Sequence, residues 1–88
     1  MNLQPDFSII TDNLSRSMVQ SAWTILTPEN IEFLKNYIPH QGTGFMWDSN
    51  PTIEKIKERI DETYPGHSGA SLAFTLRMLQ RLIHISYI

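Results

Sequence analysis

Residues 66–88 constrain the fold most, because they predict one long helix with an unusually broad apolar surface. Residues 69–86 are rich in strong helix formers and contain no proline. At about 100° per residue, one line along this helix carries Leu72, Leu76, Leu79 and Ile83. Further side chains widen the apolar arc to about 200°: Phe74, Thr75, Met78, Leu82 and Ile85. An arc this wide predicts a central helix that is packed from at least two sides.

Three shorter helices are predicted before the long one, at residues 12–25, 28–38 and 51–63. Two of them have a clear start, because Thr27-Pro28 and Asn50-Pro51 each place a capping residue before a proline. Pro39 ends the second of these helices. We therefore expect an all-α, small four-helix domain that spans residues 1–88.

Each shorter helix has one apolar stripe that we expect to face the core. The stripe of the first helix consists of Leu14, Met18, Val19, Ala22, Trp23 and Leu26. The second stripe consists of Ile31, Leu34 and Ile38, and the third of Ile53, Ile56 and Ile60. Residues 1–11 are predicted to form an extended arm on the core, with a short edge strand as the alternative. Residues 39–50 are predicted to form a loop.

Charge and composition narrow the functional classes. The formal net charge is −2, which argues against a strongly basic nucleic-acid-binding protein as the default. The chain has no cysteine, so it has no disulfide, thiolate metal ligand or cysteine nucleophile. The first ten residues lack the basic and apolar regions of a signal peptide, and no apolar run is long enough for a membrane span. We expect a cytoplasmic protein without a cofactor.

The start of the long helix is rich in small residues, and two interpretations remain open. Small side chains would let another backbone approach closely. Alternatively, the unpaired N–H groups and the positive dipole end of the helix could hold an anion. The anion-binding residues would then be His67, Ser68, Gly69 and Ser71.

Three large apolar residues, Phe45, Met46 and Trp47, follow one another in the 39–50 loop. Such residues usually tuck under a loop and cover the core. The alternative is an exposed knob that binds a partner, because large aromatic side chains anchor protein interfaces.

A narrow polar strip on the long helix is the second candidate for partner binding. It contains Arg77, Gln80, Arg81 and His84. Arg77 and Arg81 are one turn apart, and like charges at that spacing slightly destabilise a helix. An acidic residue of the 51–63 helix, an acidic protein partner or a phosphate group would offset this repulsion.

Catalytic and metal sites are not supported by the motifs. His67 and Ser68 are adjacent, but the chain has no G-x-S-x-G motif and no spacing typical of zinc ligands. We therefore expect a non-catalytic protein-binding module, such as a small adaptor, regulator or inhibitor. One alternative is weak binding of nucleic acid or a phosphate ligand through the start of the long helix and Arg77/Arg81; a small enzyme that uses His67 is another. A self-complementary helix face would also give a twofold homodimer.

Overall fold

The computed structural model describes residues 5–39, 44–46, 48–64 and 69–86. In this part of the chain the regular elements are, in order, the 3-10 helix η1 (Phe7–Ile9), α1 (Asn13–Trp23), α2 (Pro28–Asn36), α3 (Pro51–Thr63) and α4 (Gly69–Ser86). The predicted all-α, four-helix fold is confirmed. The predicted bounds of the third and fourth helices match those of α3 and α4, and the first and second helices end two residues earlier than expected.

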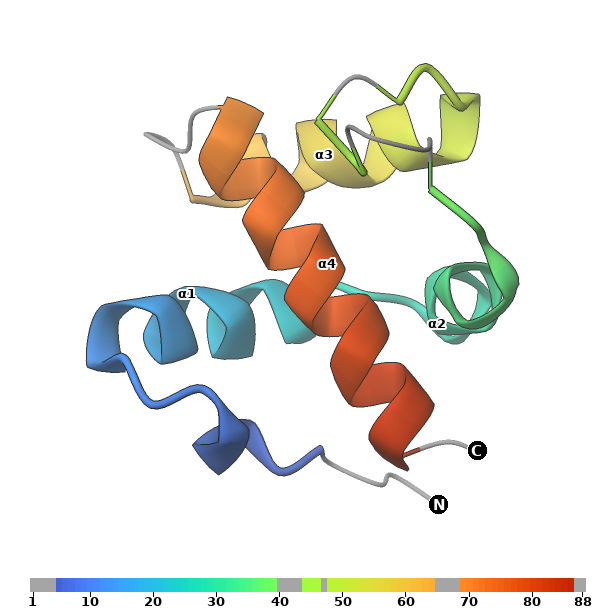
Figure 1. Ribbon diagram of the computed structural model, residues 1–88. Helices are drawn as coiled ribbons and strands as arrows, with labels where there is room; N and C mark the ends of the chain where they lie inside the picture. The colour runs from blue at the N-terminus through green and yellow to red at the C-terminus, as the bar shows by residue number, and fades with distance from the viewer. Residues whose placement is uncertain (1–4, 40–43, 47, 65–68, 87–88) are drawn as a thin grey trace.

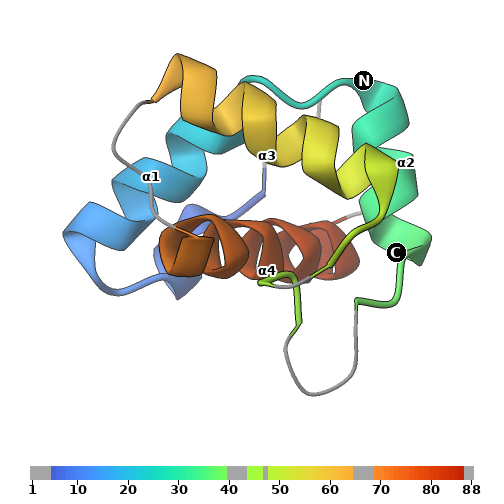
Figure 2. The same ribbon diagram turned by 90° about the horizontal axis from the view of Figure 1, so that it is seen from above.

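Helix α4 is the central element. It crosses the front of the molecule and contacts α1, α2 and α3 (Figure 1). Seen from above, the other three helices lie on one side of α4, and no helix covers its opposite side (Figure 2). The sequence predicted that this helix is packed from at least two sides. It contacts three helices, but these share one side of it, and Phe74 and Ile85 of the predicted apolar arc are 41% and 51% exposed.

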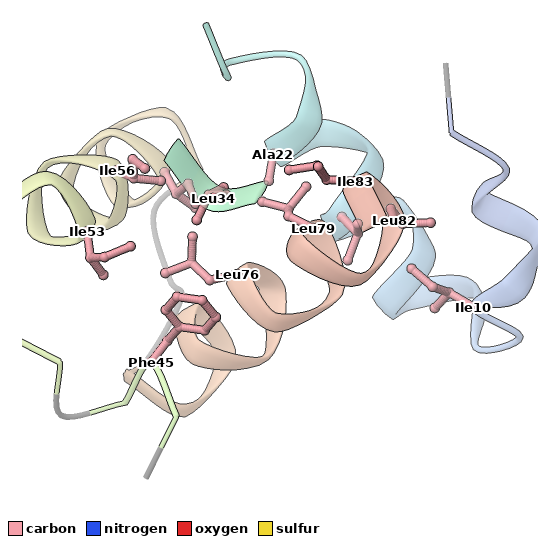
Figure 3. Close-up of a cluster of buried hydrophobic side chains, with 12 residues drawn as sticks. Ile10, Ala22, Leu34, Phe45, Ile53, Ile56, Leu76, Leu79, Leu82 and Ile83 are labelled. Carbon is pink, nitrogen blue, oxygen red and sulfur yellow. The ribbon is translucent and has the colours of Figure 1, made fainter. Parts of the chain in front are cut away.

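The core forms where the apolar stripes of the four helices meet (Figure 3). α4 contributes four side chains that are almost fully buried: Leu76, Leu79, Leu82 and Ile83. The other helices add Val19 and Ala22 from α1, Leu34 from α2, and Ile53, Ile56 and Ile60 from α3. The predicted stripe of α3 is thus confirmed residue by residue. Thr75 is also buried, and its hydroxyl donates to the Ser71 carbonyl oxygen at 2.8 Å.

Two residues predicted to face the core are instead exposed. Ile38 is 84% exposed because α2 ends at Asn36 and the backbone turns extended at Tyr37 (φ −82°, ψ 136°), so Ile38 leaves the helical stripe. Leu14 is 72% exposed because it lies in the first turn of α1, whereas the buried residues of α1 lie in its second half. In both cases the sequence periodicity continues past the region of helix contact.

The described part of the N-terminal arm, from Pro5 onward, contains a helical turn and no strand. Residues Phe7–Ile9 form one turn of 3-10 helix, capped by the Asp6 carboxylate, which accepts from the Ser8 backbone N–H at 3.0 Å. The arm lies on α1, where the Phe7 ring meets the Trp23 ring edge-on at 6.3 Å. Arg16 secures it further by donating to the Ile10 carbonyl oxygen at 2.9 Å.

The helix starts confirm the predicted cap-and-proline pattern. Thr27 and Asn30 form a reciprocal capping box at the start of α2. The Asn50 side chain accepts from the first backbone N–H groups of α3. In both α2 and α3, proline occupies the first helical position, where its missing N–H costs nothing. Ser68, which directly precedes α4, lies outside the described residues.

Candidate functional site

Part of the predicted polar strip on α4 holds the end of α2. The last carbonyl groups of a helix have no partner within the helix and need one elsewhere. The Gln80 side-chain amide donates to the Leu34 carbonyl oxygen at 2.9 Å and to the Tyr37 carbonyl oxygen at 2.6 Å. Gln80 thus caps the C-terminus of α2 from a distant part of the chain.

His84 does the same one turn later on α4. Its Nε2 atom lies 2.8 Å from the Lys35 carbonyl oxygen. Because a carbonyl oxygen only accepts hydrogen bonds, Nε2 is the protonated ring nitrogen that donates here. Gln80 and His84, both predicted as partner-binding residues, therefore have a structural role in the fold.

Replacing Gln80 with alanine should measure how much the capping of α2 by Gln80 contributes to stability. We expect the free energy of unfolding to fall by about 1–3 kcal/mol, because two half-buried carbonyl groups lose their donor. Urea denaturation followed by circular dichroism would give the value. The neighbouring Arg81→Ala change is the control and should stay within about 0.5 kcal/mol, since Arg81 is exposed. Equal losses in the two variants would contradict the capping role.

The two arginines of the strip differ from Gln80 and His84. Arg77 and Arg81 are exposed and, by helical spacing, lie on the side of α4 opposite its buried residues. None of the nine acidic side chains, all of which belong to the described residues, forms an ion pair with either arginine. Of the three possibilities that would offset the repulsion between the arginines, an acidic residue of α3 is therefore ruled out for the described residues. No acidic side chain of the described residues offsets their mutual repulsion.

Apolar side chains flank these arginines. Phe74 is 41% exposed and Ile85 is 51% exposed, and both lie on the same side of α4 as the arginines. We call Phe74, Arg77, Arg81 and Ile85 the exposed α4 face. Along its edge is an open depression of about 510 Å³, named here the basic hollow, which is lined by Arg77, Gln80, Arg81, His84 and Ile85.

A second depression, of about 540 Å³, lies on α2. This acidic hollow is lined by Glu29, Glu32, Phe33, Asn36 and Tyr37. Glu29 and Glu32 are exposed and, within the described part of the chain, have no ion-pair partner. The Glu32 side chain accepts one hydrogen bond from Asn36 Nδ2 at 3.2 Å. Sequence reasoning did not single out these residues, because two carboxylates on a helix are typical of any solvated face.

The 39–50 loop covers the core with Phe45. Phe45 is only 2% exposed and belongs to the hydrophobic core. Its ring stacks on Tyr37 at a centroid distance of 6.1 Å, and Tyr37 stacks on Phe33 at 5.0 Å. Phe45 is therefore not a surface contact residue, and the core interpretation is confirmed for it. Met46 is 41% exposed, and Trp47 lies outside the described residues.

A buried carboxylate connects this loop to α2. The Tyr37 hydroxyl donates to Asp48 Oδ2, and the Asn50 backbone N–H donates to Asp48 Oδ1 at 2.9 Å. Burial of the Tyr37 ring, with the hydrogen bond and the negative charge of Asp48, raises the pKa of Tyr37 to about 12. The sequence carried no signal for this pair, because its members lie eleven positions apart and share no recognisable motif.

The remaining predicted site is only partly described. His67 and Ser68 lie outside the described residues, so the anion-binding prediction is not tested by them. Gly69 starts α4, and Ser71 follows in its first turn. The described residues contain no cluster of histidine and acidic side chains that could hold a metal ion. Nor does any helix among them combine the length and hydrophobicity needed to cross a bilayer.

Comparisons with protein families, curated proteins and solved structures gave no match to this chain. Function must therefore be argued from the side chains themselves.

Proposed function

We propose that the protein is a non-catalytic protein-binding module, a small adaptor, regulator or inhibitor, that contacts its partner through the exposed α4 face. The observation that carries this proposal is the pair Arg77 and Arg81. Both are exposed, one helical turn apart and without an ion pair to any acidic side chain of the described chain. A partner that supplies carboxylates would remove their repulsion and form charge-assisted hydrogen bonds.

The neighbours of the arginines favour a protein over a nucleic acid. Phe74 and Ile85 place apolar area beside the two charges, and protein interfaces combine aromatic and arginine side chains in this way. A phosphate-binding surface would need more cations, yet the whole chain has seven lysine and arginine residues against nine acids. The absence of cysteine is compatible with a reducing compartment, and we place this function in the cytoplasm.

Charge reversal on α4 tests the proposal. We expect the double variant Arg77→Glu/Arg81→Glu to lose its stoichiometric partner in affinity capture from a lysate of the source organism. Each new carboxylate would then face the carboxylates of the partner and repel them. Nuclease treatment of the lysate before capture should leave the wild-type result unchanged.

The matched control is Lys55→Glu/Arg59→Glu on α3. These residues are also basic, exposed and four positions apart, so the variant has the same net charge as the α4 variant. It should retain the partner. If both variants lose the partner equally, the cause is net charge and not the exposed α4 face. If the wild type loses the partner after nuclease treatment, nucleic acid is favoured instead.

A further inference from the structure

The chain carries two surface depressions that have opposite charge. They resemble each other in size and in combining a pair of like charges with an apolar side chain. The basic hollow on α4 and the acidic hollow on α2 have volumes of about 510 and 540 Å³. Each has two like charges about one helical turn apart, at Arg77 and Arg81 or at Glu29 and Glu32, and an apolar side chain between or beside them. We propose that the basic hollow of one copy binds the acidic hollow of a second copy. This inference rests on the proposed binding role of the exposed α4 face and names a partner for it.

The spacing of the charges matches. Along a helix axis, Arg77 and Arg81 are separated by about 6 Å, and Glu29 and Glu32 by about 4.5 Å. Arginine and glutamate side chains are long enough to absorb the difference. Within the described chain neither pair of charges has an ion-pair partner, so an intermolecular pairing does not have to break any existing salt bridge.

Apolar contact accompanies the charges on both sides. Ile85 lines the basic hollow, and Phe33 lines the acidic one. Phe33 is also held in place by stacking on Tyr37, so its position is fixed before any contact forms. Burial of these side chains would favour association at ionic strengths where exposed ion pairs alone are weak.

The two hollows adjoin each other. Tyr37 lines the acidic hollow, and its carbonyl oxygen accepts from Gln80, which lines the basic hollow. A reciprocal contact between two copies would therefore place both complementary pairs in a single interface. A stable interface of standard size takes about 800 Å² from each partner, roughly a seventh of the 5685 Å² surface of this chain. The net charge of −2 gives little overall repulsion between copies.

Sedimentation of the purified full chain over a range of concentrations tests the inference. We expect the wild type to self-associate at low ionic strength and to dissociate as salt is added. The variants Arg77→Glu/Arg81→Glu and Glu29→Lys/Glu32→Lys should each associate at least tenfold more weakly. Lys55→Glu/Arg59→Glu is the control and should associate like the wild type.

A mixture of the two charge-reversed variants gives the sharpest result. In an equimolar mixture the new glutamates of one chain face the new lysines of the other, so association should return to near wild-type strength. The Glu29→Lys/Glu32→Lys variant puts two cations near the start of α2, where they oppose the helix dipole. If it does not fold, the neutral Glu29→Gln/Glu32→Gln variant replaces it in the comparison of single variants with the wild type. A wild type that stays monomeric at every concentration overturns the inference, and so does a mixture of folded variants that does not associate.

The two proposals fail separately. A monomeric wild type that still loses a captured partner through Arg77→Glu/Arg81→Glu leaves the protein-binding function intact and removes only self-association. If self-association needs both hollows and the lysate yields no other partner that depends on α4, the second copy is the partner.

Discussion

Replacing Leu76 with alanine is expected to lower the free energy of unfolding by about 2–5 kcal/mol. Leu76 is fully buried, and its side chain lies among residues of three other segments, including Leu34, Ile53 and Phe45 (Figure 3). Truncation removes apolar contact with all of them and leaves a cavity in the middle of the core. A domain of this size has a total stability of only about 4–13 kcal/mol, so the loss would be a large part of it.

Phe74→Ala on the same helix is the control for Leu76→Ala. It removes a larger side chain, but one that is 41% exposed on the uncovered side of α4. We expect a loss below about 1 kcal/mol, because less contact area returns to water. Guanidinium unfolding curves of both variants would decide the matter. A greater loss for Phe74→Ala than for Leu76→Ala would mean that the two sides of α4 are assigned the wrong way round.

The stability of the protein should fall between about pH 10 and pH 12 because of Tyr37. Its pKa is about 12 in the folded chain and about 10 when unfolded. In this interval the folded state binds more protons than the unfolded state, so raising the pH favours unfolding. The neutral phenol therefore stabilises the fold fully below pH 10, and this stabilisation is lost above it.

Tyr37→Phe isolates this effect. At neutral pH the variant should be less stable by about 1–3 kcal/mol, because the buried Asp48 carboxylate loses one donor. The stability difference between wild type and variant should then shrink as the pH rises towards 12. Unfolding curves at several pH values, together with the ultraviolet absorbance of tyrosinate, would measure both quantities. A difference that does not change with pH would contradict the role of the Tyr37–Asp48 hydrogen bond.

The helices were predictable from the sequence because their signals are local. A capping residue, a proline and an apolar period act within a few neighbouring residues, and the starts of α2 and α3 show each of them. The two residues wrongly predicted to face the core have a common cause of error. Ile38 and Leu14 continue an apolar period beyond the part of the helix that a neighbour covers, and periodicity carries no information about where that contact ends.

The candidate site was harder to predict because its contacts are long-range. Gln80 and His84 resembled ordinary surface residues in the sequence, yet they cap carbonyl groups more than forty residues away. Arg77 and Arg81 have the same polar character on the same helix and no such contact. Gln80 and His84 differ from Arg77 and Arg81 because α4 crosses the end of α2 on their side. The sequence pattern contains no information about that crossing.

The position of α4 along the chain has a consequence for biosynthesis. The helix that the other three pack against is also the last of the four to leave the ribosome. Until it emerges, the isoleucine stripe of α3 and the buried side chains of α1 lack the helix that contributes most to their cover. The nascent chain must therefore hold three partly formed helices with exposed apolar faces, a state in which chaperones bind and aggregation begins. Folding of this domain is expected to start only after α4 has left the ribosome and to involve the whole core at once.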